Sequence, residues 1–407
     1  MKNSWVAFIE SNTSGTGRLF ARSAAECGYR PVVIAERPDR YQYIRQDSLD
    51  HVACDTGSMD SLCQALETSA REAPPAGICS SSEYFLETAA LLARRFGLPG
   101  ADPEALRSCR NKWTQRQRLR DAGFLSPKFE WVTSLDGARA ALETIPPPVV
   151  LKPVLGSGSV GVRLCRTAEE ALAHAEVLLR RAANERGQPL ASELLLEEYL
   201  VGPEFSVEVF GGLVLGITRK YVSPEPFFVE LGHDFPAELP AQEAESITDV
   251  ARRAVNALGL MWGPVHIELR MTARGPTIVE INPRLAGGFI PEIIRLALGV
   301  DVVRETIRLV VGQQPELRPQ FQRHASIRFV VPPGSGTIRE ISGMSEALAI
   351  EGVADVQAYR KPGDHVEIEN DFRDRIGHAI ACRDLEMEAA QAAAQACGRI
   401  RIHVEAE

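Results

Sequence analysis

The sequence predicts an α/β (α+β) protein built from several structural units. At 407 residues, of which 45% are hydrophobic, the chain can bury a sizeable core, and its length indicates two to four domains. Short apolar runs alternate with helical patterns over the first hundred residues, which is typical of a parallel sheet with crossover helices. From Glu204 onward, strand-like runs follow one another through short turns, which indicates an antiparallel sheet.

Residues 1–105 form the predicted parallel unit. Its strands are the runs WVAFIES, PVVIAE and GICSSS, and its helices are expected at 18–27, at 58–71 and over EYFLETAALLARRFG. The turn SNTSGTG at 11–17 lies where a dinucleotide-binding loop would open a helix, but it lacks the third glycine of that motif. A polar turn facing a substrate, or a plain tight turn, fits it better.

Three further units are expected. Residues 106–200 contain a helical linker and then strands around a glycine-rich turn, with helices near 135–143 and 168–184. Residues 201–312 contain the antiparallel run, a helix at 241–258, a hairpin at 264–282 and a helix at 291–311. Residues 313–407 mix strands with an alanine-rich terminal helix and offer few obvious chemical groups.

Composition limits the classes of partner and compartment. The net charge of −9 gives no basic footprint for nucleic acid, so small molecules are the expected partners. No segment has eighteen consecutive apolar residues, and the first apolar stretch, Trp5–Ile9, is too short for a signal-peptide core. The eight cysteines form no Cys-x-x-Cys pair. We therefore expect a cytoplasmic protein with reduced thiols and no membrane partner.

Charge at the end of a buried strand marks the predicted hairpin, PVHIELRM and PTIVEIN around TARG. If residues 273–275 form a three-residue loop, Thr272 faces Pro276 and Glu268 lies opposite Glu280. Alternation then places His266, Glu268 and Arg270 on one face with Ile278, Glu280 and Asn282. The other face holds Val265, Ile267, Leu269, Val279 and Ile281 as core.

Two carboxylates about 5 Å apart across a ladder repel each other, so a cation is expected between them. Mg²⁺ suits Glu268 and Glu280 because it binds carboxylate oxygens and is usually completed by substrate phosphates. Asn282 offers a neutral oxygen to the same site, and Arg284 a partner for a phosphate or an oxyanion. The alternative is an exposed hairpin whose glutamates contact Arg270, Arg284 or water.

A glycine-rich turn follows Lys152 in VVLKPVLGSGSVGV. Its residues Gly156, Ser157, Gly158, Ser159 and Gly161 would let backbone N–H groups approach phosphate, while Lys152 supplies a charge. No Walker motif is present and VRLCRT continues as a strand, so we expect a hairpin flap rather than a P-loop. An ordinary mobile hairpin is the alternative.

The junction EEYLVGPEF also suits a nucleotide. Glu198, Tyr199 and Leu200 could face an adenine edge, and Glu204 could accept from ribose hydroxyls. The same pattern fits any acidic connection between two strands.

In this order, these motifs resemble the ATP-grasp superfamily, and more narrowly its L-amino acid ligases, the dipeptide synthetases of the bacilysin and dapdiamide type. The resemblance implies a pre-ATP-grasp domain at 1–105, a flap subdomain at 106–200, a large subdomain at 201–312 and a C-terminal α+β domain at 313–407. It also implies ATP held by the flap and by the hinge from Glu197 to Glu204, Lys112 and Lys152 on phosphate oxygens, and one or two Mg²⁺, with Mn²⁺ as an alternative ion.

The segment FVELGHDFPAEL also resembles the amino acid ligases. The resemblance implies Glu230 as a contact for a substrate ammonium and His233 as a polar group near the reacting carboxylate, with a structural hydrogen bond as the alternative for His233. Gly287 and Gly288 would let the backbone approach the substrate, and Phe289 would limit its side chain.

The implied reaction is ATP-dependent and forms ADP. A carboxylate becomes an acyl phosphate, and an amine then displaces the phosphate, giving a dipeptide or a similar amide. Lys152, Arg284 and His233 are the expected catalytic residues. A ligase for a non-amino-acid carboxylate and a non-catalytic nucleotide-binding regulator are the alternatives, and the resemblance allows a homodimer.

Overall fold

The N-terminal sheet has four parallel strands in the order β3-β2-β1-β4. The computed structural model describes residues 4–13, 15–71, 73–156, 158–181 and 192–406. The strands are β1 (Trp5–Ile9), β2 (Arg30–Ala35), β3 (Asp50–Ala53) and β4 (Gly77–Cys79). The helices are α1 (Thr16–Glu26), η1 (Pro38–Arg40), α2 (Gln42–Gln46), α3 (Met59–Ser69), η2 (Glu83–Phe85) and α4 (Leu86–Arg95). The predicted parallel sheet is confirmed, whereas β3 gives no sequence signal because its four residues are mostly exposed.

Two helices, α5 (Pro103–Arg110) and α6 (Lys112–Asp121), lead to a second sheet. Asn111 separates them, because its side chain caps α6 by accepting the backbone N–H of Thr114 at 2.9 Å. The second sheet is antiparallel, in the order β5-β8-β6-β7. Its strands are β5 (Phe129–Val132), β6 (Val149–Pro153), β7 (Arg163–Cys165) and β8 (Leu194–Glu198), packed against α7 (Leu135–Thr144) and α8 (Ala168–Leu179).

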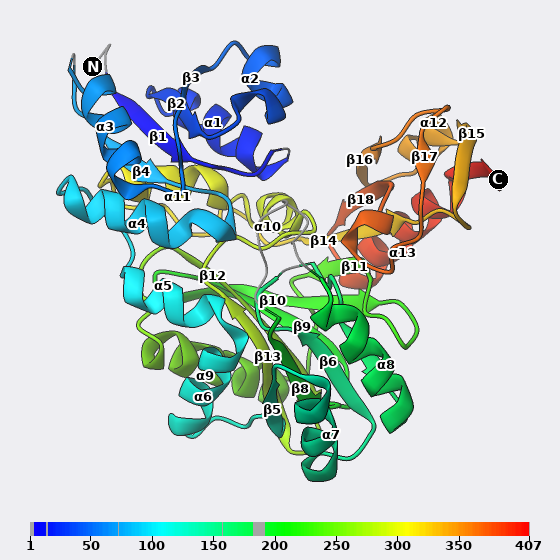
Figure 1. The fold of residues 1–407 in the computed structure, drawn as a ribbon. Helices are drawn as coiled ribbons and strands as arrows, with labels where there is room; N and C mark the ends of the chain where they lie inside the picture. Colours follow the sequence, from blue (N-terminus) through cyan, green and yellow to red (C-terminus); the bar gives the residue numbers. More distant parts are fainter. Residues whose placement is uncertain (1–3, 14, 72, 157, 182–191, 407) are drawn as a thin grey trace.

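The central sheet has eight strands in the order β13-β12-β9-β10-β11-β14-β18-β16. They are β9 (Glu204–Phe210), β10 (Leu213–Val222), β11 (Glu230–Phe235), β12 (Pro264–Thr272), β13 (Gly275–Asn282), β14 (His324–Val330), β16 (Val353–Ala358) and β18 (Gly377–Arg383). Helix α9 (Ala241–Ala257) packs on β9, β12 and β13 through a buried apolar cluster. Because β11 pairs with β14, this sheet runs across residue 313 into the C-terminal region (Figure 1).

The helix predicted over 291–311 is in fact two helices, α10 (Ile290–Leu298) and α11 (Val302–Val310). Gly299 has a φ of 73°, the left-handed conformation that ends α10, and the Asp301 side chain caps α11. The remaining elements are β15 (Gly336–Ser342), α12 (Met344–Leu348), β17 (His365–Val366), η3 (Phe372–Asp374), α13 (Glu386–Arg399) and β19 (Arg401–Glu405). The alanine-rich terminal helix is confirmed as α13.

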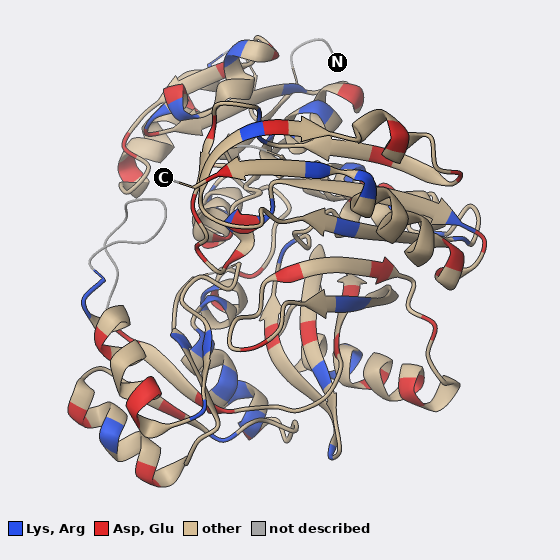
Figure 2. Cartoon of the chain, turned by 90° about the vertical axis from the view of Figure 1, so that its right-hand side faces the viewer, with Lys and Arg blue, Asp and Glu red and all other residues tan. Residues whose placement is uncertain are grey.

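Figure 2 shows Lys and Arg interspersed with Asp and Glu along the visible elements. All eight cysteines lie among the described residues and carry free thiols. Within the described ranges, no helix has both the length and the apolar character needed to cross a membrane.

Candidate active site

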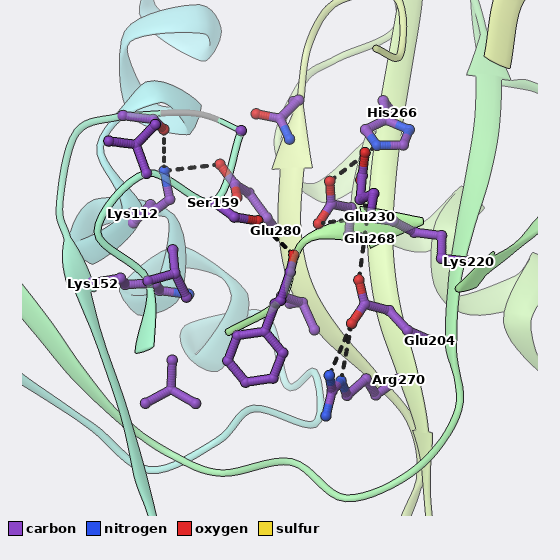
Figure 3. Close-up of a pocket in the computed structure, with 18 of the residues that line it drawn as sticks. Lys112, Lys152, Ser159, Glu204, Lys220, Glu230, His266, Glu268, Arg270 and Glu280 are labelled. Atoms are coloured by element: carbon purple, nitrogen blue, oxygen red, sulfur yellow. Dashed lines mark hydrogen bonds and ion pairs between the residues drawn. The ribbon is translucent and has the colours of Figure 1, made fainter. Parts of the chain in front are cut away.

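One pocket gathers most of the predicted site residues. It holds about 1260 Å³ of space free of protein atoms, part of it open to solvent, between α6, the second sheet and the central sheet (Figure 3). Arg375 adds a wall from the C-terminal region. The predicted residues that line it are Lys112, Lys152, Gly156, Gly158, Ser159, Glu197, Glu198, Tyr199, Leu200, Glu204, Glu230, Glu268, Glu280, Asn282, Arg284, Gly287 and Gly288. Ser157 lies outside the described residues, and Gly161, His233 and Phe289 are not among the lining residues.

The hairpin of β12 and β13 places Glu268 opposite Glu280, as the sequence predicts. The predicted three-residue loop is wrong. Thr272 pairs with Gly275, so only residues 273–274 form the turn. A β-bulge after Glu268 restores the predicted pairing, because one residue of β13 has no partner on β12.

The bulge also changes which side chains face the core. Ile278 was expected beside the glutamates but is 1% exposed and belongs to the apolar cluster under α9. Val279 was expected in the core but lines the pocket. Both corrections follow from the bulge, because an extra residue reverses the alternation of side chains on either side of it.

Helix α6 covers the outer edge of β13. Arg116 donates from Nη1 to the carbonyl oxygen of Ile278 at 2.8 Å and from Nη2 to that of Val279 at 2.6 Å. Gln115 donates to the carbonyl of Ile281 at 2.7 Å and accepts its N–H at 2.9 Å. These side chains take the place of a neighbouring strand, so the bulged edge that carries Glu280 is held on both sides.

Protein cations pair with the two facing glutamates. Glu280 Oε1 lies 3.0 Å from Lys112 Nζ, and Glu268 lies 3.3 Å from Lys220 Nζ and 3.1 Å from His266 Nε2. Burial opposes a charge on His266, but Glu208, 3.0 Å from Nδ1, and Glu268 raise its pKa to about 9. Each glutamate is therefore neutralised separately, by side chains of the protein.

Lys220 on β10 is the centre of a buried charge cluster that the sequence did not indicate. Its Nζ lies 2.8 Å from Glu230, 3.2 Å from Glu204 and 3.3 Å from Glu268 (Figure 3). Burial disfavours the lysine charge, yet the three carboxylates raise its pKa well above the ordinary value. Burial likewise opposes the charge on Glu230 and Glu268, but Lys220 outweighs it and lowers the pKa of both carboxyls.

Lys152 and Arg116 share one buried carboxylate, Glu197, which is 4% exposed. Burial works against its charge, but the two cations prevail and lower the pKa of Glu197 to about 2. Burial also lowers the pKa of Lys152, against the attraction of Glu197. Glu197 thus holds Lys152 at the pocket wall, beside the glycine-rich turn.

The flap is tied to three other parts of the chain. Lys112 donates to the carbonyl oxygen of Gly156 at 2.6 Å, and the Ser159 hydroxyl donates to that of Phe228 at 3.1 Å. Gly158 has a φ of 65°, and its carbonyl accepts the backbone N–H of Phe372 at 3.3 Å. A Cβ on Gly158 would lie 2.4 Å from the Phe372 ring, so only glycine allows this approach.

The predicted hinge residues line the pocket through differing contacts. Leu200 offers its carbonyl to Arg270 at 2.7 Å, and the Tyr199 hydroxyl donates to Glu225 at 2.5 Å. Glu204 is bound by Arg270 at 3.0 Å and by Lys220. A role for Glu204 with ribose therefore requires it to share these cations.

His233 lies behind the pocket wall, whereas Phe289 is exposed and is not among the lining residues. His233 is fully buried, and among the described residues neither ring nitrogen has a hydrogen-bond partner. Burial lowers its pKa to about 3, so the ring is neutral. A Cβ on Gly288 would meet its Nε2 at 2.5 Å, which places the ring directly behind that backbone. Phe289 stacks on Tyr359 with ring centroids 6.2 Å apart.

Arg284 lines the pocket and is held by the N-terminal unit. Its Nε and Nη2 donate to Glu83 Oε2 at 2.9 and 2.8 Å. The residues that sequence reasoning missed are Glu83, Arg116, Lys220, His266 and Arg375. Only His266 gave a signal, since alternation placed it beside Glu268.

The donor set fits a divalent cation bound with phosphate. Glu268, Glu280 and Asn282 supply oxygens, and Lys112 and Lys152 supply positive charge on the flap side. Across the described residues, there is no group of three or more His, Cys, Asp or Glu placed to hold a metal by themselves. The amide of Asn282 and a ligand's phosphate oxygens would therefore have to complete the coordination.

Comparison with known proteins gives two family matches. Residues 145–292 match an ATP-grasp domain, and residues 328–405 match the L-amino acid ligase C-terminal domain 2. The chain is 37% identical to the uncharacterized protein y4rH of Sinorhizobium fredii, over 91% of this chain and 77% of that protein. It is 27% identical to the alanine–anticapsin ligase of Bacillus subtilis, over 66% of this chain and 59% of that enzyme.

A solved structure supports the fold. The L-amino acid ligase from Bacillus licheniformis superposes with a TM-score of 0.82 at 22% identity, covering 100% of both chains. The chain matches a smaller part of some other curated relatives. For the carnosine synthase 1 of Mus musculus it covers 30% of that protein's length.

Proposed function

This chain belongs to the ATP-grasp family of carboxylate–amine ligases, and from that premise we propose that it joins two amino acids into a dipeptide. ATP would be converted to ADP and phosphate in the process. The main support is the pair Glu268 and Glu280, which face each other in one pocket with Lys112 and Lys152. The match to an L-amino acid ligase C-terminal domain favours amino acid substrates.

The pocket residues suit ATP and Mg²⁺ in a defined arrangement. Glu268, Glu280 and Asn282 would hold the ion, which would supply neutralisation of the polyphosphate charge. Lys112 and Lys152 would bind phosphate oxygens, and the glycine-rich flap would cover them with backbone N–H groups. The adenine would lie against the hinge of Glu198, Tyr199 and Leu200.

The proposed chemistry has two steps. An oxygen of the first substrate's carboxylate attacks the γ-phosphorus, the bond to ADP breaks, and an acyl phosphate forms. The amine nitrogen of the second substrate then attacks the carbonyl carbon, phosphate leaves, and the nitrogen loses a proton. Arg284, fixed by Glu83, would stabilise the oxyanion of the tetrahedral intermediate. Glu230 would bind the first substrate's ammonium, and flap closure would keep water from the acyl phosphate.

His233 acts differently from its predicted role in this scheme. Because it is neutral and lies behind Gly288, it would act on the reacting carboxylate only through that backbone. We propose that the His233 ring supports the pocket wall behind Glu230, since its Nε2 lies 3.7 Å from Glu230 Oε2.

The test is a screen in which pairs of amino acids are mixed with the protein, ATP and Mg²⁺. Phosphate release is measured for each pair, and the mass of any product is determined by mass spectrometry. A product equal to two amino acids minus water supports the proposal. ADP formation that depends on a carboxylate other than an amino acid's would favour the alternative ligase. No ADP with any pair would contradict the dipeptide assignment.

A further inference from the structure

Arg375 brings a cation into the pocket from a region where the sequence offered few chemical groups. It directly follows η3, lines the pocket, and has a side chain only 14% exposed. Its Nη1 donates to Glu230 Oε2 at 3.0 Å, and its guanidinium carbon lies 4.5 Å from the ring centroid of Phe329. The ring and the carboxylate fix the plane of the guanidinium.

Buried carboxylates hold the segment that carries Arg375 through backbone hydrogen bonds. Asp374 is 6% exposed and accepts the backbone N–H groups of Glu369 at 2.8 Å and Asn370 at 2.9 Å. Asp371 is 2% exposed and accepts the N–H of Arg373 at 2.9 Å. Because this loop is already ordered, Arg375 can bind a ligand with little loss of conformational entropy.

Arg375 has donors to spare. Glu230 binds Lys220 at 2.8 Å, and Arg375 contacts it through Nη1 alone. Within the described part of the chain, the hydrogen bonds of the Arg375 guanidinium are Nη1 to Glu230 and Nε to the Phe372 carbonyl. Its Nη2 therefore keeps two N–H groups for a ligand.

The other cations of the pocket are engaged. Lys112 and Lys152 pair with Glu280 and Glu197, and the Arg284 fork is bound to Glu83. Arg270 is bound to Glu204, and Lys220 is shared by three carboxylates. A guanidinium with free N–H groups is the preferred partner of a planar carboxylate.

We infer that Arg375 binds the α-carboxylate of the amine-donating substrate. The inference rests on the proposed function: the first substrate's carboxylate is consumed in the reaction, whereas that of the second persists into the product. The second substrate would then be an amino acid with a free carboxylate rather than a simple amine or an amino acid amide. The C-terminal region thus contributes a specificity-determining residue to the site.

The experiment compares each second substrate with its carboxamide. For wild-type protein, kcat/KM should be at least about 10-fold higher with the free amino acid than with its amide, because the amide loses one hydrogen bond between charged groups. Arg375→Gln should raise KM for the amino acid about 10- to 100-fold, abolish the preference over the amide, and leave KM for ATP and for the first substrate within about threefold. Arg375→Lys should recover part of the preference.

Arg360→Gln is the matched control, because Arg360 is exposed in the same region. It should keep the wild-type preference. If Arg375→Gln keeps that preference, or if its KM effect falls on the first substrate, the inference is wrong while the proposed function stands. If wild-type protein turns over no amino acid pair, both are wrong.

Discussion

Glu197→Gln is the sharpest test of how the pocket's charges are maintained. The change keeps the shape of the side chain but leaves Lys152 and Arg116, both buried, without their shared anion. Arg116 also supports the bulged edge of β13, so its displacement would reach Glu280. We therefore expect losses of both stability and nucleotide binding.

The size of the stability loss follows from the pKa. Glu197 has a pKa of about 2 in the folded protein, against an ordinary value of 4.5. A folded-state pKa below the unfolded one adds stability that is present above the unfolded value and is lost as the pH falls toward the folded one. The difference corresponds to about 3 kcal/mol at pH 7, and to about 1 kcal/mol less at pH 4.

Urea unfolding of wild type and Glu197→Gln at pH 7 and pH 4 measures both quantities. Exposed Glu67, on α3, provides the control, since Glu67→Gln should change the unfolding free energy by no more than about 0.5 kcal/mol. Equal stability of wild type and Glu197→Gln at pH 7, or a difference that grows on acidification, would refute the reasoning. Weaker ATP binding should accompany the stability loss, because Lys152 would no longer be held at the wall.

Three further changes test separate parts of the site. Glu280→Gln should lower ADP formation by about 100-fold or more in a coupled assay while leaving the circular dichroism spectrum intact, and wild-type turnover would rule out Glu280 as a metal ligand. Gly158→Ala should loosen the flap, because the φ of 65° at this position and the Phe372 ring both oppose a Cβ. Water would then hydrolyse part of the acyl phosphate, so the ratio of ADP to amide product should rise above one, and an unchanged ratio would contradict this. Lys220→Met should lower the unfolding free energy by about 3–5 kcal/mol, because three buried carboxylates lose their shared cation. Lys361→Met, at an exposed position, should have little effect, and equal stability of the two variants would show that Lys220 does not neutralise the cluster.

The hairpin shows how a sequence can give the right site through wrong local detail. The facing of Glu268 and Glu280 was predicted by counting from a three-residue loop, and it holds because the bulge adds the residue that the shorter loop lacks. The loop was not predictable, since TARG fits both a two- and a three-residue turn. The bulge that compensates for the shorter loop also has no sequence signal of its own. At the bulge, the carbonyl groups of Ile278 and Val279 accept hydrogen bonds from Arg116, which lies on α6, far away in the sequence.

The missed residues are those whose roles depend on distant partners. Arg375 is 145 positions from Glu230, and Glu83 is 201 positions from Arg284. In the local sequence, Lys220 reads as an ordinary polar position in an alternating strand, and nothing marks the three glutamates it joins. Motif spacing can place residues of one hairpin or one flap together, but only the tertiary fold brings these pairs into contact.

The charge of the pocket is opposite to that of the chain. The whole sequence has 54 acidic residues against 45 lysines and arginines, yet seven lysines and arginines and six glutamates line the pocket. The protonated His266 adds to this excess. Since most of these charges pair with one another, a polyphosphate would enter by exchanging partners: Lys112 would leave Glu280 for a phosphate oxygen, and a divalent cation would take its place. Such an exchange conserves the number of ion pairs, which explains how a pocket with this many buried charges can be stable before a ligand binds and still favour an anion.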